Sequence, residues 1–301
     1  MAVKRFIQPK TYEELGAALS CMDPDSKVIA GGTDLVIKVK NNDPEIPVLV
    51  SLCKTPELKG IWVSDDEEGQ TLHIGAMNTH AEIAESELVR KHAAALAESC
   101  GSVGSQQIRN RGTAGGNLGN ASVAGDVLPV LYLLHADLLI TGPDCSERII
   151  SAEELAERPG KTTLSYNEIV KEMLIPVRPE RHSLFVKMGA REEVTIAEIS
   201  LCLSWECEEG KIANVEGILG AVDSKPVWLT EVDALLGKGS ISNEDLDELS
   251  DSLAERIRVV RMNRKRPPRL RIREGEREYK ERAVKGVVYD AAEKLMRQNN
   301  T

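Results

Sequence analysis

Two glycine pairs constrain this chain more than any other feature of its sequence. Among 23 glycines, only Gly31-Gly32 and Gly115-Gly116 are adjacent to each other, and a threonine lies close to each pair. A glycine has no Cβ atom, so it can adopt positive φ and let successive N–H groups point toward one anion. Each pair alone is typical of a tight turn. The two pairs together predict two loops that close on a diphosphate from opposite sides.

Neither glycine loop matches a common nucleotide-binding motif. The spacing differs from the G-x-G-x-x-G fingerprint of dinucleotide-binding folds, and neither loop carries the Gly-Lys pair of a Walker A loop. The sequence therefore argues against both of these architectures.

The 301 residues are enough for two or three domains. Residues 1–58 alternate strand and helix signals and are expected to form a small α/β subdomain. Residues 59–176 carry mixed signals, which predict an α+β subdomain, and residues 177–301 are expected to form a sheet followed by helices. The fold class that we expect is α+β.

Local patterns predict elements in the first two parts. Apolar runs at residues 27–30 and 47–52 are typical of buried parallel strands. An acidic turn between residues 61–64 and 71–75 predicts a hairpin. Helices are expected over residues 90–99 and 127–135, with a glycine-rich stretch between them at 101–125.

The last third has a simpler pattern, with strands first and helices afterwards. Three antiparallel strands are expected at 183–190, 196–206 and 213–221, and helices at 229–236, 243–260 and 276–298.

Composition excludes several classes of function. A net charge of −10 and an aromatic content of 3% argue against a nucleic-acid-binding protein. No apolar run reaches the roughly 18 residues of a membrane span, and the N-terminus lacks the apolar core of a secretory signal. We therefore expect a cytoplasmic protein with reduced thiols. The six cysteines form no C-x-x-C pair and the five histidines are scattered, so the sequence predicts no metal site and no catalytic residue.

Basic residues are concentrated near the C-terminus. Residues 255–285 contain 13 Lys/Arg and 5 Asp/Glu, which leaves −18 for the remainder of a chain whose net charge is −10. The stretch is either a solvated helical face or a docking surface for an acidic partner.

Asp126 follows the second glycine pair within a turn or two. Its carboxylate is placed either to bind a ribose or ribityl hydroxyl, or to cap the helix expected from residue 127. Spacing alone leaves both interpretations open.

Three motifs resemble one known family. They are AGGTDL at residues 30–35, QIRNRGTAGGNL at 107–118 and ASVAGD at 121–126. They look like the FAD-binding (medium) subunit of the molybdenum hydroxylases, a family that includes bacterial xanthine dehydrogenases, carbon monoxide dehydrogenase and nicotinate dehydrogenase. The likeness continues over nearly the whole chain. It implies a two-subdomain FAD-binding fold of the PCMH/vanillyl-alcohol-oxidase type, followed by a three-stranded antiparallel sheet with helices.

The resemblance also implies a set of cofactor-binding residues. Lys187 would lie near the flavin, where a cation favours the reduced anionic ring; a surface lysine on a strand is the alternative. Ile169 and Val170 would line the pocket, and Arg109 and Arg111 either neutralise phosphate or are solvated. The full set comprises Ala30, Gly31, Gly32, Thr33, Asp34, Leu35, Thr113, Ala114, Gly115, Gly116, Asn117, Asp126, Ile169, Val170 and Lys187.

The implied function is electron transfer within a complex. A large molybdenum-cofactor subunit would hydroxylate the substrate, and a small 2Fe–2S subunit would pass electrons to FAD in this chain, which would deliver them to NAD⁺ or another acceptor. The resemblance favours a xanthine dehydrogenase-like complex. Two alternatives are a stand-alone FAD-dependent oxidase and a nucleotide-binding scaffold without redox turnover.

Overall fold

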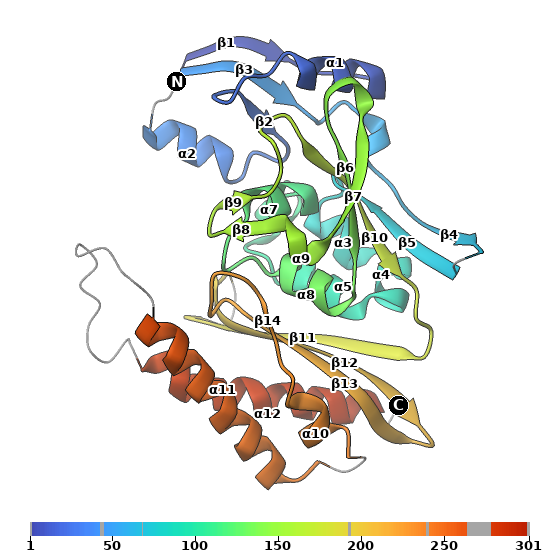
Figure 1. The fold of residues 1–301 in the computed structure, drawn as a ribbon, viewed down its shortest axis with the longest axis vertical. Helices are drawn as coiled ribbons and strands as arrows, with labels where there is room; N and C mark the ends of the chain where they lie inside the picture. Colours follow the sequence, from blue (N-terminus) through green and yellow to red (C-terminus); the bar gives the residue numbers. More distant parts are fainter. Residues whose placement is uncertain are drawn as a thin grey trace.

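The first part of the chain forms a small parallel sheet at one end of the molecule (Figure 1). The structure, a computed structural model, describes residues 2–42, 45–67, 69–191, 194–238, 241–263 and 278–299. The sheet has the order β1-β3-β2, and the two strands predicted from apolar runs are parallel neighbours within it. The first strand, β1, was not predicted. The elements are β1 (Ala2–Ile7), α1 (Tyr12–Ser20), β2 (Lys27–Ile29), α2 (Leu35–Asn42), β3 (Glu45–Ser51) and the short 3-10 helix η1 (Pro56–Leu58).

A five-stranded antiparallel sheet forms the centre of the molecule. Its order is β4-β5-β10-β6-β7, and the predicted hairpin supplies β4 and β5. A separate small ladder pairs β8 with β9. The strands are β4 (Ile61–Asp66), β5 (Gly69–Gly75), β6 (Asp137–Thr141), β7 (Glu147–Ser151), β8 (Ala156–Arg158), β9 (Lys161–Thr162) and β10 (Ile169–Pro176).

Short helices pack against this central sheet. Two predictions were wrong here: the expected helix over residues 90–99 is divided at Ala93, whose φ and ψ are −149° and 55°, and the glycine-rich stretch contains two helices. The helices are α3 (His80–Glu85), α4 (Glu87–His92), α5 (Ala94–Gly101), α6 (Gln106–Arg109), α7 (Ala114–Asn120), α8 (Val127–Leu133), η2 (Pro143–Cys145) and α9 (Ala152–Leu155).

The third sheet has four antiparallel strands where the sequence predicted three. The fourth, β14, has only two residues, too few for a sequence pattern to reveal it. Helices α11 and α12 cover one face of the sheet (Figure 1). The elements are β11 (Arg181–Gly189), β12 (Ala197–Glu208), β13 (Lys211–Gly220), β14 (Val227–Trp228), α10 (Val232–Leu236), α11 (Asn243–Asn263) and α12 (Tyr279–Asn299).

Both faces of this third sheet are apolar. The cross-strand partners Phe185, Cys202 and Ile218 are buried in the central core. Their neighbours Leu184 and Leu203 are buried on the other side, in the core shared with α11 and α12. Since successive side chains of a strand point to opposite faces, the sheet contributes one face to each of two hydrophobic cores. Within the described residues, no helix is long and apolar enough to cross a membrane.

Candidate functional site

The two glycine segments meet backbone to backbone. A Cβ atom placed on Gly31 would lie 1.9 Å from the carbonyl oxygen of Arg111 and 2.7 Å from its carbonyl carbon. Such distances are impossible, so the first loop can occupy this position only because residue 31 is a glycine. Ala30 and Gly116 are also neighbours, because a Cβ on Gly116 would lie 3.5 Å from the Cβ of Ala30. The structure thus brings together the two segments that the sequence predicted to share a ligand.

The first glycine loop carries the free hydrogen-bond donors of the site. It joins β2 to α2, and Gly32 has a φ of +78°. Within the described part of the chain, no group accepts a hydrogen bond from the backbone N–H of residues 31–34. These residues are half-buried, apart from the exposed Asp34. Consecutive backbone amides without partners are suited to an anionic ligand.

The second glycine pair does not form the loop that we predicted. It lies in the first turn of α7, where the Thr113 hydroxyl accepts a hydrogen bond of 3.1 Å from the N–H of Gly116. The N–H groups of Ala114 and Gly115 donate to the carbonyls of Asn78 and Ala76, respectively. These amides are therefore used by the fold, and the free amides of the site belong to the first loop.

Packing explains why the first turn of α7 contains two glycines. A Cβ on Gly115 would lie 2.5 Å from the Cβ of Ala76, so this position admits no side chain. Gly116 is exposed and Asn117 half-buried, and the Asn117 carboxamide has no hydrogen bond within the described residues. The second segment therefore presents a small surface and one carboxamide beside the first loop.

Polar contacts fix the first loop against the end of α7. The Asp34 carboxylate accepts a hydrogen bond of 3.3 Å from the Asn120 side chain, and Lys38 donates to the oxygen of the same carboxamide. Leu35 begins α2 directly after the loop. Asp34 thus contributes its side chain to the structure and only its backbone N–H to the free donors.

Asp126 and Lys187 form a buried ion pair. Lys187 lies on β11 two residues after Phe185, so it points from the third sheet toward the central core. Its Nζ lies 2.6 Å from Oδ2 of Asp126 and 2.8 Å from the carbonyl oxygen of Ser102, and both charged side chains are 7% exposed. Asp126 makes no side-chain capping bond to α8. Asp126 thus occupies the N-cap position of α8 without capping it through its side chain, and the surface interpretation of Lys187 is wrong.

The other carboxylate oxygen of Asp126 has no partner. Oδ1 is fully buried without a hydrogen bond within the described residues. Burial raises the pKa of Asp126, and the Lys187 ammonium opposes that rise. Burial also raises the pKa of Cys100 to about 12, with a further contribution from Asp126. A buried oxygen without a partner is a place where a ligand hydroxyl can donate a hydrogen bond.

Ile169 and Val170 lie at the start of β10 and face opposite sides of the central sheet. Ile169 is buried in the N-terminal core and Val170 in the central core. Both side chains thus have structural roles, and their contact with a cofactor stays a prediction.

One polar residue at the junction of the two glycine segments was not predicted. His80 begins α3, its side chain is buried, and its Nδ1 has no hydrogen-bond partner within the described residues. Its backbone N–H donates to the carbonyl of Gly112 over 3.0 Å. The sequence offered no signal for this position, since a single histidine after a helix-capping threonine is ordinary.

We expect His80→Phe to reduce the sensitivity of the fold to acid. Burial, with a further contribution from Arg109, lowers the pKa of His80 from 6.5 to about 4. Between these two pH values the unfolded chain binds a proton that the folded chain does not, so stability is lost as pH falls through this range. Wild-type protein should lose on the order of 3 kcal/mol more than the variant between pH 7 and pH 4. Urea unfolding at several pH values measures this difference; parallel curves would contradict it.

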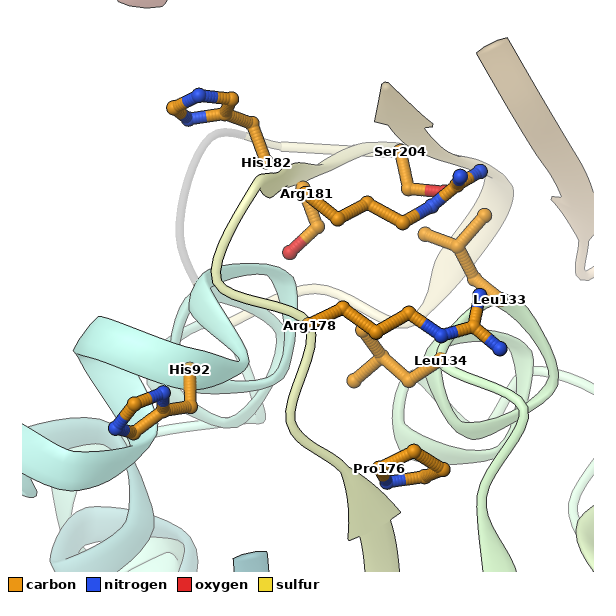
Figure 2. A pocket seen from close by; sticks show the side chains of 9 residues that line it. His92, Leu133, Leu134, Pro176, Arg178, Arg181, His182 and Ser204 are labelled. Carbon is orange, nitrogen blue, oxygen red and sulfur yellow. The ribbon is translucent and has the colours of Figure 1, made fainter. Parts of the chain in front are cut away.

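A surface pocket lies elsewhere, at the junction of the central and third sheets (Figure 2). Its lining includes His92, Arg178, Arg181 and His182. Arg181 is held by the carboxylates of Glu206 and Glu216. None of the predicted cofactor-binding residues lines this pocket. Among the residues that the structure describes, no cluster of His, Cys, Asp or Glu could hold a metal ion.

Comparison with known proteins identifies relatives over most of the chain. Residues 2–178 match the family described as the FAD binding domain in molybdopterin dehydrogenase. The nicotinate dehydrogenase FAD-subunit of Eubacterium barkeri is 30% identical over 291 residues, which cover 94% of this chain and 92% of that protein. The xanthine dehydrogenase FAD-binding subunit of Escherichia coli O157:H7 is 24% identical, over 78% of this chain and 80% of that protein.

The fold matches solved structures over nearly its full length. Quinoline 2-oxidoreductase from Pseudomonas putida 86 contains a chain with a TM-score of 0.80 and 24% identity, covering 98% of this chain and 99% of that chain. This likeness extends beyond residue 178, where the family match ends, and therefore includes the third sheet and its helices.

Proposed function

This chain belongs to the FAD-binding domain family of the molybdopterin dehydrogenases, and we propose that it is the electron-transfer subunit of a molybdenum hydroxylase complex. The observation that carries the proposal is the row of free backbone amides at residues 31–34, held against the second glycine segment by the contact of Gly31 with Arg111. A diphosphate needs several converging donors, and this row supplies them.

The residues present fit FAD. We assign the diphosphate to the first glycine loop, from Ala30 to Leu35. The segment from Thr113 to Asn117 would line the other side of the same site. The unpartnered buried oxygen of Asp126 would accept a hydrogen bond from a hydroxyl of the cofactor. Bound FAD supplies the ability to take up and release electrons, and the protein positions it.

The buried ion pair of Lys187 and Asp126 would lie beside the cofactor, and the net charge of the pair is near zero. Because Asp126 compensates Lys187, the ammonium would act as an oriented donor more than as an isolated positive charge. The two residues come from the central and third parts of the chain, so the pair also holds these parts together at the proposed site.

We further propose that this subunit receives electrons from a small 2Fe–2S subunit, which takes them from a large molybdenum-cofactor subunit, and delivers them to NAD⁺ or another acceptor. The resemblance favours a xanthine dehydrogenase-like complex, and the sequence does not specify the substrate. Relatives named for nicotinate, xanthine, nicotine and caffeine support a wider proposal, in which the complex hydroxylates a nitrogen heterocycle.

Purification from source cells under mild conditions tests this function. We expect FAD, molybdenum and iron to elute with this chain in one chromatographic peak, with the flavin bleached by a heterocyclic substrate. A flavoprotein without molybdenum that consumes oxygen alone would identify a stand-alone oxidase. A chain that purifies with nucleotide but shows no flavin reduction would identify a scaffold.

The basic C-terminal stretch leads to a prediction about assembly. Most of its described cations form ion pairs within the chain, as in Arg256 with Glu231, Arg261 with Glu281 and Lys280 with Glu198. These contacts indicate that the paired cations bind acidic residues of this chain and not those of a partner. Arg264, Lys265, Arg266 and Arg269 lie outside the described residues, and the docking hypothesis now rests on them.

Changing these four residues to Glu should slow association with the partner subunits and flatten its dependence on salt. Association rates measured at several ionic strengths check this, with the melting temperature of the isolated chain as control. A lower melting temperature with an unchanged rate and salt slope would show that the cluster is structural.

A further inference from the structure

The imidazole of His80 has unused hydrogen-bonding capacity at the point where the two glycine segments meet. The side chain is 2% exposed, Nδ1 is enclosed without a partner, and no hydrogen bond to either ring nitrogen is present within the described residues. Buried polar groups in native proteins nearly always have partners, so an unbonded imidazole needs an explanation.

The ring lies directly against the second segment. A Cβ built on Gly112 would be 3.2 Å from Cδ2 of His80 and 3.5 Å from the hydroxyl of Thr33 in the first loop. Cδ2 is bonded to Nε2, so this edge of the ring faces the junction. Burial lowers the pKa of His80 to about 4, so the imidazole is neutral at neutral pH and has one N–H to donate.

A cation near the ring also lacks a balancing charge. Arg109 ends α6, and its guanidinium donates to the carbonyls of Val103 and Gly104 over 3.4 and 2.9 Å. Within the described residues, no carboxylate forms an ion pair with it. The Thr33 hydroxyl likewise has no hydrogen bond there. The Cδ2 edge of His80 and the Thr33 hydroxyl therefore both lie close to Gly112, and the Arg109 guanidinium is near enough to contribute to the lowered pKa of His80.

We propose that His80 is a binding residue of the FAD site, and that Nε2–H on the ring edge facing Gly112, not the enclosed Nδ1, donates a hydrogen bond to the diphosphate of the bound dinucleotide beside Arg109 and Thr33. An anion at this place would accept a hydrogen bond from the imidazole and would also balance the positive charge of the guanidinium. The inference rests on the proposed function, because it takes FAD as the ligand.

The test compares His80→Phe with the wild type as the full chain stripped of its flavin. Phenylalanine keeps a planar ring of similar size but has no hydrogen bond to offer. We expect the dissociation constants of FAD and of ADP, which shares the diphosphate, to rise about tenfold, and that of riboflavin to stay unchanged. The thermal unfolding of the flavin-free chain should be unchanged or shifted upward, because the variant no longer buries an unbonded nitrogen. His92→Phe, which alters a histidine of the separate surface pocket, is the matched control and should bind FAD normally.

Three outcomes would overturn the inference. Unchanged FAD affinity in a folded His80→Phe chain would make the imidazole a packing group. Weaker FAD binding with unchanged ADP binding would show that His80 contacts the flavin part of FAD and not the diphosphate. If His80→Phe does not fold, ¹⁵N NMR spectra of the wild-type imidazole, recorded with and without FAD, serve as the test. Ring nitrogen signals that do not shift when FAD binds would exclude the contact. A wild-type chain that binds no FAD would instead reject the proposed function.

Discussion

Gly31→Ala is expected to lower the affinity of the chain for FAD by at least about a hundredfold. The new methyl group would lie 1.9 Å from the Arg111 carbonyl oxygen, and its nearest contacts are all backbone atoms, which cannot turn aside. The first loop must therefore move away from the second segment, and its free amides move with it. Overpacking of this kind costs roughly 1–3 kcal/mol of stability, which leaves the chain folded. Titration of FAD into the flavin-free chain, followed by flavin fluorescence, measures the change.

Two glycines provide graded controls for this experiment. A Cβ on Gly119 in α7 meets nothing within 4 Å, so Gly119→Ala should leave FAD affinity unchanged. Gly32→Asn should weaken binding only moderately, because asparagine tolerates positive φ and a Cβ there meets only side chains at 3.4 Å or more. A folded Gly31→Ala chain with wild-type affinity would show that the contact of the two segments is unrelated to FAD binding.

Lys187→Met should destabilise the folded chain by about 3–5 kcal/mol at neutral pH. The change leaves the Asp126 carboxylate buried without its cation, and the cost of that isolated charge exceeds the gain from an apolar side chain. This loss of stability should shrink as pH falls. Burial raises the pKa of Asp126, Lys187 opposes that rise, and the variant removes Lys187, so the carboxyl group becomes protonated more readily. Stability of the variant is then lost as pH increases through the raised pKa of the folded state.

Urea unfolding from pH 5 to pH 8 checks both parts of this prediction. The double variant Asp126→Leu with Lys187→Met should be more stable than Lys187→Met alone, because it removes the unpaired charge. Lys285→Met breaks an exposed ion pair with Asp247 and should have no measurable effect. Equal effects of Lys187→Met and Lys285→Met would show that the buried pair does not stabilise the fold.

The sequence predicted elements well where one local pattern determined the structure. The hairpin of β4 and β5, the parallel neighbours β2 and β3, and the first three strands of the third sheet follow from alternation, apolar runs and turn residues. The junction of the two glycine segments was also anticipated, although its geometry was not. Glycine marked the contact because close approach of two backbones requires it.

Several of the errors arise from contacts between residues distant in sequence. Glycines at 115 and 116 normally oppose a helix, but the Thr113 cap and the space limited by Ala76 decide the structure there. Asp126 has the spacing of a helix cap, yet Lys187, 61 residues later, takes its carboxylate. His80 gave no signal at all, because a sequence does not show that, among the described residues, no group bonds its buried Nδ1.

The third sheet, with one face in each of two cores, determines how this protein can be divided. The match to the FAD-binding domain ends at residue 178, just before β11, and this boundary suggests a place to cut the chain. It would uncover the surfaces that Phe185, Cys202 and Ile218 now cover and remove the partner of Asp126. An excised flavin domain would therefore be prone to aggregate, and the intact chain should unfold as one cooperative unit. Chimeras that exchange C-terminal portions between relatives would have to exchange the third sheet together with the surface of the central core that it covers.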